Sequence, residues 1–241
     1  MSVLLIMPAF NEEECIGAAI SDVRRALPGF DLLVVDDGSI DATPWVAQNA
    51  GAIVISLPFN LGVGAAMRAG FRFARERGYS RIVQIDADGQ HDPSEVPRLL
   101  EQLDVADLVI GARFAGRGDY TVRGPRRWAM IVLSRVLSRV TGVPLTDSTS
   151  GFKALGPRAL ELFARDYPAE YLGDTIEALV IASKAGCRIA QVPVIMRERT
   201  GGTPSHQPLR SAVYLGRASM ALLIGLMRRT PSIQSTIGSE Q

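Results

Sequence analysis

Five short apolar segments alternate with segments of helical spacing over the first 112 residues, and this alternation limits the possible folds more than any other feature of the sequence. The apolar segments are residues 3–7, 32–35, 53–57, 82–85 and 108–110. Apolar residues recur three and four positions apart, as in amphipathic helices, in residues 15–27, 42–50, 63–77 and 95–103. Short strands that are apolar on both faces are typical of a parallel sheet covered by helices on both sides. The sequence therefore predicts an α/β fold with a mostly parallel sheet flanked by helices.

Polar residues follow four of the predicted strands at their carboxyl ends. Ligands of such sheets bind in the crevice outside the carboxyl ends of the strands. We therefore expect a binding site at this edge of the sheet. The polar segments begin at Pro8, Asp36, Asn60 and Asp86.

The most informative of these ends carries two carboxylates, Asp86 and Asp88, directly after the fourth strand. Two carboxylates this close cannot both be charged at low cost unless a cation joins them. Oxygen ligands of this kind suit Mg²⁺ or Mn²⁺, often bound together with a substrate diphosphate. Gln90 offers a neutral oxygen nearby, and His91 or Asp92 would extend the shell. The alternative is a solvated Asp-rich turn, but the position after a buried strand favours a metal site.

Two further strand ends offer ligand positions. Asp37 is the expected contact to a base or ribose, a role that acidic residues at strand ends have in nucleotide-binding folds. Asp41 is expected instead to cap the helix at 42–50. The third strand leads to Gly64 and Arg68, where glycine permits close approach of the backbone and arginine would face a phosphate. A surface position for Arg68 is the alternative.

Several common protein classes are excluded by missing motifs. The glycines of residues 60–68 match neither G-x-G-x-x-G nor a P-loop, which argues against a Rossmann dehydrogenase and a P-loop NTPase. Only Cys15 and Cys187 are present, so neither a disulfide framework nor a zinc cluster is expected. The first residues lack the basic leader of a signal peptide, and no run reaches the roughly 18 apolar residues of a spanning helix. We therefore expect a cytoplasmic protein.

The near-neutral net charge of +1 hides a strong asymmetry along the chain. Residues 113–139 hold seven Arg and one Asp, and residues 184–241 hold eight basic and two acidic residues, so each stretch has a net charge of +6. The remainder holds 11 basic and 22 acidic residues, a net charge of −11. Such segregation points to an anionic ligand or surface on one side of the molecule, and no motif suggests a nucleic-acid partner.

Beyond residue 112 the pattern changes. The expected elements are a Gly- and Arg-rich loop at 115–124, a helix at 126–141, a turn at 147–152 leading into a short strand, a helix at 175–184, a strand at 189–194 and a polar loop at 197–208. An apolar-rich tail helix with surrounding arginines is expected at about 209–227, before a flexible end at 230–241. The tail helix either lies in a lipid interface with its arginines on anionic headgroups, or packs on the core or on a second subunit.

Five motifs occur in one order between residues 8 and 114: PAFNEEE, VVDDGSIDAT, NLGVGAAMRAG, QIDADGQHDP and GARF. Together they resemble the nucleotide-sugar-binding half of inverting family 2 glycosyltransferases, which have the GT-A fold with a Rossmann-like sheet. Within that family the chain is most similar to dolichyl- or polyprenyl-phosphate sugar transferases. The resemblance implies a glycosyltransferase domain at 1–206, whose residues 1–112 bind the donor and 113–206 the acceptor, followed by an amphipathic tail helix at 207–229.

The resemblance also implies roles for single residues. The nucleotide sugar would be held by Pro8, Asn11, Glu12, Asp37, Gly64, Arg68, Asp86 and Ala87. The divalent cation, Mg²⁺ or Mn²⁺, would be ligated by Asp86, Asp88 and Gln90. Arg113 matches an arginine that meets the acceptor phosphate, and Arg126 or Arg127 would supply the second cation. Arg199 and Ser205, which complete the phosphate-binding set, match an R-x-x-G-x-x-S loop that closes over the diphosphate.

A lipid phosphate acceptor would need no general base, because its oxygen is already an anionic nucleophile at neutral pH. Attack opposite the leaving group would invert the anomeric carbon. A hydroxyl acceptor would need a base, for which Asp174 is the candidate; its alternative role is to cap the helix at 175–184, paired with Glu177. We expect a hexosyltransferase bound peripherally to the inner face of the cell membrane, with a homo-oligomer left open.

Two other functions stay as alternatives. A sugar nucleotidyltransferase would require a Gly-rich loop with Arg and Lys after the first strand, and residues 8–14 contain none of these. A non-catalytic sugar-nucleotide-binding subunit is disfavoured by the intact D-x-D motif and by Arg113.

Overall fold

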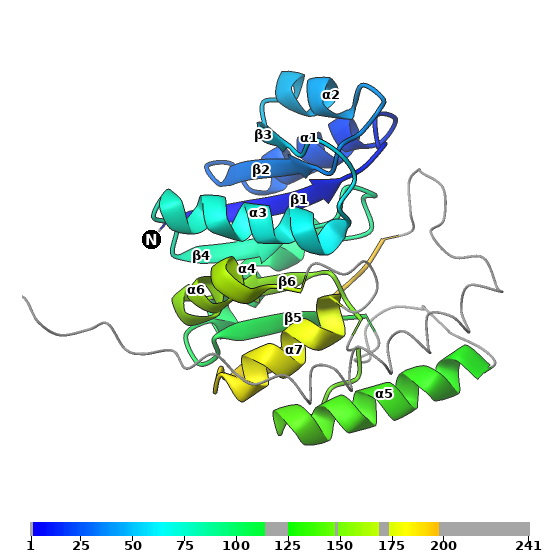
Figure 1. The fold of residues 1–241 in the computed structure, drawn as a ribbon, viewed down its shortest axis with the longest axis vertical. Coiled ribbons are helices and arrows are strands. Elements are labelled where there is room, and N and C mark those ends of the chain that lie inside the picture. The colour runs from blue at the N-terminus through cyan, green and yellow to red at the C-terminus, as the bar shows by residue number, and fades with distance from the viewer. Residues whose placement is uncertain (1, 114–124, 148, 169–173, 198–241) are drawn as a thin grey trace, which may run out of the picture.

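The computed structural model describes residues 2–113, 125–147, 149–168 and 174–197, with the backbone alone for residues 125–132 and 174. Within these ranges a single seven-stranded sheet has the order β3-β2-β1-β4-β6-β5-β7 (Figure 1). Every pairing is parallel except those of β6, which is antiparallel to both of its neighbours. The predicted α/β fold with a mostly parallel sheet is thus confirmed. The strands are β1 Val3–Ala9, β2 Asp31–Asp36, β3 Ile53–Ser56, β4 Arg81–Gln84, β5 Leu108–Ala112, β6 Lys153–Leu155 and β7 Ile189–Pro193.

Helices cover both faces of the sheet (Figure 1). Side chains alternate along a strand, so Leu4 and Ile6 of β1 pack under one helical layer and Leu5 and Met7 under the other. Among the helices that the structure describes, none combines the length and the apolar character needed to cross a bilayer. The first layer contains α3 Val63–Glu76, α6 Pro157–Asp166, α7 Asp174–Lys184 and α5 Pro125–Thr141; the second contains α1 Ile16–Ala26, α2 Thr43–Asn49, α4 Val96–Gln102 and the preceding 3₁₀ turn Pro93–Glu95.

Each predicted helix and strand that falls within these ranges is confirmed, with ends displaced by at most two residues. Such displacements are usual, because helix ends fray and their last turns are often irregular. Helix α6 was not among the expected elements, although Pro157 at its first position and the spacing of Leu160 and Phe163 favour a helix. The predicted loop at 115–124, the polar loop predicted at 197–208 except for its first residue, the tail helix and the flexible end lie outside the described residues.

The reversed direction of β6 decides which loops meet at the functional edge of the sheet. The other strands all end at this edge, whereas β6 begins there. Lys153, its first residue, is in register with Gln84 of β4 and Ile110 of β5. Residues 149–152, which lead into β6, therefore arrive between the ends of β4 and β5, close to the predicted metal ligands and to Arg113.

Two arginines of α3 cover the C-terminal end of α6. Arg72 Nε donates a hydrogen bond to the Ala164 carbonyl at 3.2 Å, and Arg68 Nη2 donates to the Arg165 carbonyl at 2.9 Å. Cations at this end satisfy exposed carbonyls and interact favourably with the helix dipole. The hydrogen bond to α6 therefore helps to fix the side chain of Arg68, which belongs to α3.

Candidate functional site

The loops after β1 and β2 are tied together by hydrogen bonds. Asn11 Oδ1 accepts from the Ile40 amide at 3.0 Å, and the Asn11 amide donates to Ser39 Oγ at 2.9 Å. The Glu12 amide donates to Thr43 Oγ1 at 2.8 Å. Asn11 has a φ of 54°, a left-handed conformation that Asn tolerates better than most residues. The predicted donor-binding residues Asn11 and Glu12 thus belong to a fixed wall at the carboxyl ends of β1 and β2.

Asp37 holds the loop that leads into α3. Its two carboxylate oxygens accept hydrogen bonds from the Leu61 and Gly62 amides, both at 2.8 Å, and the residue is buried. Burial raises the pKa of Asp37 above its ordinary value, against the effect of the two amides, and the charge of Asp36 raises it further. Gly64 lies buried in the first turn of α3 beside this loop. The structure thus gives Asp37 a framework role, and its contact with a nucleotide stays a prediction.

Asp41 stabilises the start of α2, as predicted, although it lies one residue before the cap position. Its Oδ1 accepts from the Thr43 amide at 3.0 Å, and its Oδ2 accepts from the Glu13 amide at 3.2 Å. Burial raises the pKa of Asp41, but hydrogen bonds from the Thr43 hydroxyl and from these amides outweigh it, so the pKa lies below its ordinary value.

The carboxylates of the D-x-D motif follow β4 directly. The side chain of Asp86 is 38% exposed, Ala87 is buried, and Asp88 Oδ1 accepts from the Gln90 amide at 3.0 Å, which closes the turn. Within the part of the chain that the structure describes, no group of three or more His, Cys, Asp or Glu is placed to hold a metal. Two carboxylates and the amide oxygen of Gln90 make an oxygen-only donor set, which suits Mg²⁺ or Mn²⁺ with further ligands from a substrate diphosphate.

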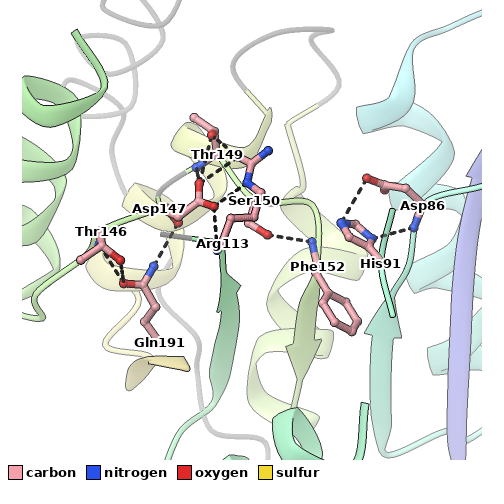
Figure 2. Close-up of polar contacts among 9 residues, drawn as sticks. All are labelled: Asp86, His91, Arg113, Thr146, Asp147, Thr149, Ser150, Phe152 and Gln191. Carbon is pink, nitrogen blue, oxygen red and sulfur yellow. Dashed lines mark hydrogen bonds and ion pairs between the residues drawn. The ribbon is translucent and has the colours of Figure 1, made fainter. Parts of the chain in front are cut away.

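His91 contacts Asp86 through both of its ring nitrogens (Figure 2). Nδ1 accepts from the Asp86 amide at 2.9 Å, and Nε2 lies 3.5 Å from Asp86 Oδ2. The buried imidazole also stacks on Phe152, with ring centroids 4.8 Å apart and planes at 13°. His91 was expected to extend the metal shell. This arrangement does not favour that role, because the ring already contacts Asp86 and Phe152.

The turn before β6 passes directly beside Asp86. A Cβ at Gly151 would lie 2.9 Å and 3.1 Å from the two carboxylate oxygens of Asp86, closer than side chains normally pack, so only glycine fits there without moving them. Ser150 is buried, and its Oγ accepts from the Phe152 amide at 3.2 Å. Figure 2 shows this turn between Asp86 on one side and Arg113 on the other.

Arg113, at the end of β5, forms a two-pronged ion pair with Asp147. Its Nε lies 2.6 Å from Oδ2 and its Nη2 lies 3.0 Å from Oδ1, while Nη2 also donates to Thr149 Oγ1 at 2.9 Å. The Asp147 side chain is fully buried and that of Arg113 is 23% exposed. Gln191 of β7 supports this loop, because it accepts from the Thr146 amide at 2.8 Å and donates to the Asp147 carbonyl at 3.1 Å. The predicted acceptor-phosphate residue is thus held in one orientation by a buried carboxylate.

Arg197, just after β7, fastens the end of this strand to the D-x-D loop. Its amide donates to the Gln90 carbonyl at 2.9 Å, and its guanidinium lies 3.1 Å from Asp22 and 2.8 Å from Asp92. Burial raises the pKa of Asp92, but hydrogen bonds from Ser94 and the charge of Arg197 outweigh it, so the pKa is lowered. Asp92, which was expected to extend the metal shell, is therefore engaged with these protein groups.

The structure places most of the predicted site at one edge of the sheet. Five predicted residues either have the backbone alone described or lie outside the described residues. Arg126 and Arg127 lie in the first turn of α5 and Asp174 begins α7, in each case with the backbone alone described. Arg199 and Ser205 lie outside the described residues. The assigned roles of these five residues stay predictions.

Sequence reasoning missed three residues that organise the site: Asp147 as the partner of Arg113, Arg197 as a link to the D-x-D loop, and His91 as a partner of Asp86. Asp147 and Arg113 are 34 residues apart, and no local sequence pattern predicts an ion pair between residues so far apart. The role of His91 has a weak signal, because it is one of only two histidines in the sequence and lies three residues after the D-x-D motif.

Comparison with known proteins agrees with this geometry. Residues 4–163 match the family model described as glycosyl transferase family 2. The undecaprenyl-phosphate mannosyltransferase of Micrococcus luteus is 37% identical, over 84% of this chain and 86% of its own length. The polyprenol monophosphomannose synthase of Mycolicibacterium smegmatis is 35% identical, over 88% of this chain and 84% of its own. Glucosyl-3-phosphoglycerate synthase from Mycobacterium tuberculosis, crystallised with Mn²⁺, UDP and glucosyl-3-phosphoglycerate, has a TM-score of 0.68 at 25% identity, covering 100% of this chain and 84% of that one.

Proposed function

The chain belongs to glycosyl transferase family 2 and is a glycosyltransferase of the GT-A fold, and from that premise we propose that it transfers a hexose to a polyprenyl phosphate. The donor would be a nucleoside diphosphate sugar of the GDP-mannose or UDP-glucose type. Transfer would be metal-dependent and would invert the anomeric carbon. Two bacterial relatives support this acceptor, because one is named an undecaprenyl-phosphate mannosyltransferase and the other a polyprenol monophosphomannose synthase.

One observation carries the proposal: the turn at residues 147–152 has an acidic group on one side and a basic group on the other. Gly151 lies against the carboxylate of Asp86, and Asp147 orients the guanidinium of Arg113. A nucleoside diphosphate sugar and a phosphate acceptor require this combination, since one needs a cation bridge and the other needs a fixed positive charge.

The divalent cation, Mg²⁺ or Mn²⁺, would be held by Asp86, Asp88 and Gln90 together with the donor diphosphate. The oxygen-only donor set and the partial exposure of Asp86 fit such an ion. When bound, the ion would stabilise the negative charge of the leaving nucleoside diphosphate.

The acceptor phosphate would act as the nucleophile without a general base, because its oxygens are ionised at neutral pH. Arg113 would orient this phosphate and screen its charge from the donor, and Asp147 would keep the guanidinium in place. A lone pair of the phosphate oxygen forms the new bond to the anomeric carbon. The bond from that carbon to the diphosphate oxygen breaks, and its electron pair leaves with the nucleoside diphosphate.

The remaining assignments complete the proposal. The donor half would bind the nucleotide through the wall that contains Asn11 and Glu12, with Pro8, Asp37 and Arg68 around it. Arg126 or Arg127, with Arg199 and Ser205, would complete the phosphate contacts. Since a polyprenyl phosphate resides in a bilayer, the enzyme would work as a peripheral protein at the inner face of the cell membrane, as a monomer or a homo-oligomer.

Transfer to a hydroxyl acceptor is the second candidate, and the position of Asp174 favours it. Helix α7 leads into β7, which runs parallel to β5, so the start of α7 lies at the same edge of the sheet as Asp86 and Arg113. A carboxylate at that edge is where a general base would be needed.

A panel of GDP- and UDP-sugars with short polyprenyl phosphates, assayed with and without Mn²⁺, tests the proposal. We expect lipid-linked product from one donor, dependent on metal; its absence with every donor would refute the proposal. Asp174→Asn should keep most of its activity with a lipid phosphate, whereas loss of a general base would reduce activity about 100-fold or more. Asp104→Asn is the matched control, because Asp104 is an exposed carboxylate near the opposite edge of the sheet.

A further inference from the structure

We propose that His91 is a positioning residue, which holds Asp86 in the orientation that the metal-bound donor requires and uses Phe152 as its support. The inference rests on the proposed metal-dependent function and deepens it. It assigns His91 no direct contact with the metal or with a substrate.

A hydrogen bond from the Asp86 amide indicates which ring nitrogen of His91 carries the proton. A backbone amide can only donate, so Nδ1 of His91, 2.9 Å from the Asp86 amide, must be the unprotonated nitrogen. In the neutral imidazole the proton then lies on Nε2. Nε2 faces Asp86 Oδ2 at 3.5 Å. One ring therefore binds the backbone of Asp86 by a hydrogen bond and lies beside the carboxylate of the same residue.

The ring itself has little freedom to move. His91 is buried at 5% relative exposure, and its imidazole stacks nearly parallel on the fully buried ring of Phe152. Its backbone is also held by an antiparallel bridge to Met196. A group that is fixed in this way can impose its position on the more exposed Asp86.

The carboxylate of Asp86 is confined from two directions. On one side lies the backbone of Gly151, where even a methyl group would come within 2.9 Å of Oδ2. His91, which belongs to the same loop as Asp86, places its Nε2 3.5 Å from the same Oδ2. Neither nitrogen of His91 is placed to ligate a metal, because Nδ1 is used by the amide and Nε2 carries the proton. His91 therefore acts through Asp86.

Three substitutions separate the two contacts. His91→Asn keeps an oxygen near the position of Nδ1, and His91→Gln keeps an amide group near the position of Nε2. His91→Phe keeps the stacking on Phe152 and removes both contacts. Binding of Mn²⁺ to the full-length protein is measured by electron paramagnetic resonance with GDP or with UDP, and thermal unfolding is followed in parallel. We expect His91→Phe to weaken Mn²⁺ binding at least about 10-fold, in the range found for groups that hydrogen-bond to metal ligands. The Asn and Gln variants should fall between it and the wild type.

The outcomes distinguish this inference from the proposed function. If the wild type binds Mn²⁺ with a nucleotide and His91→Phe binds it equally well, the positioning role is overturned while the metal-dependent function stands. If the wild type binds no Mn²⁺ with either nucleotide, the metal dependence fails and the inference fails with it.

Nitrogen-15 NMR of the imidazole tests the arrangement without any metal. His206 is the only other histidine in the sequence, so His206→Gln assigns the signals. We expect signals that place the proton on Nε2 and none on Nδ1, since Nδ1 accepts from the Asp86 amide. A proton on Nδ1 would overturn the inference without affecting the proposed function.

Discussion

Asp147→Asn tests whether a buried carboxylate holds Arg113 in place. The substitution keeps the shape of the side chain and removes its negative charge. In the wild type, the backbone amide, Nε and Nη2 of Arg113 all point at this carboxylate, at 3.2, 2.6 and 3.0 Å. The side chain of Asp147 is fully buried, and that of Arg113 is 23% exposed. The variant therefore leaves a largely buried guanidinium without its compensating charge.

The expected cost follows from this burial. Removing one partner of a fully buried ion pair costs about 3–5 kcal/mol, whereas a single hydrogen bond to a charged group contributes about 1.5–3 kcal/mol. Because Arg113 is partly exposed and Asn still accepts one hydrogen bond, we expect a loss of about 2 kcal/mol in the free energy of unfolding. The Michaelis constant for a polyprenyl phosphate should also rise about 10-fold, since the phosphate-binding group loses its orientation.

A double-mutant cycle in urea, with Arg113→Gln as the second substitution, isolates the pair. We expect the effects of the two substitutions to be non-additive by about 1.5 kcal/mol. The Arg81–Asp104 pair is a matched control, since its arginine is also 23% exposed but its carboxylate is 70% exposed; its coupling should stay below about 1 kcal/mol. Additivity within about 0.5 kcal/mol for Arg113 and Asp147 would refute the reasoning.

Two further substitutions test the neighbouring elements. Gly151→Ala should displace the carboxylate of Asp86 and weaken binding of Mn²⁺ with a nucleotide at least about 10-fold, with little change in thermal unfolding; Gly156→Ala is the control, since its Cβ would meet nothing closer than 3.6 Å. The lowered pKa of Asp41 means that its stabilisation is present above the unfolded-state value of about 3.9 and is lost as the pH falls through the lower folded-state value. The difference in unfolding free energy between the wild type and Asp41→Ala, roughly 1 kcal/mol for lost hydrogen bonds at a helix start, should be constant from pH 7 to 5 and shrink below about pH 4; urea unfolding that shows a constant difference down to pH 3 would contradict it.

The parts of the site that could be predicted are those whose chemistry is local in the sequence. Asp86 and Asp88 follow a buried strand, and parallel strands must end at one edge of the sheet. Their position at this edge can therefore be predicted as soon as the strand before them has been identified. The boundaries of the other elements except α6 could be predicted for the same reason, because the spacing of apolar residues is a local property.

The parts that could not be predicted depend on contacts between distant segments. Nothing in the sequence of β6 states its direction, yet that direction brings Gly151 to Asp86. The sequence also does not show that Asp37 is occupied by the amides of the loop before α3. The free energy of such pairs arises from burial and geometry, and neither is defined until the sheet has formed.

The antiparallel insertion of β6 sets a limit on how this enzyme could be recombined with its relatives. A crossover at residue 113 would look natural from the motifs, since it separates the proposed donor half from the proposed acceptor half. It would, however, import a foreign β6 between β4 and β5 of this chain, and with it a foreign turn against Asp86 and His91. A hybrid that takes its proposed acceptor half from a relative, but keeps residues 147–155 of this chain, would preserve the contacts of this segment with Asp86 and His91. The residues that would have to be exchanged together as the proposed donor half are thus two separate segments of the sequence, although they are adjacent in the folded protein.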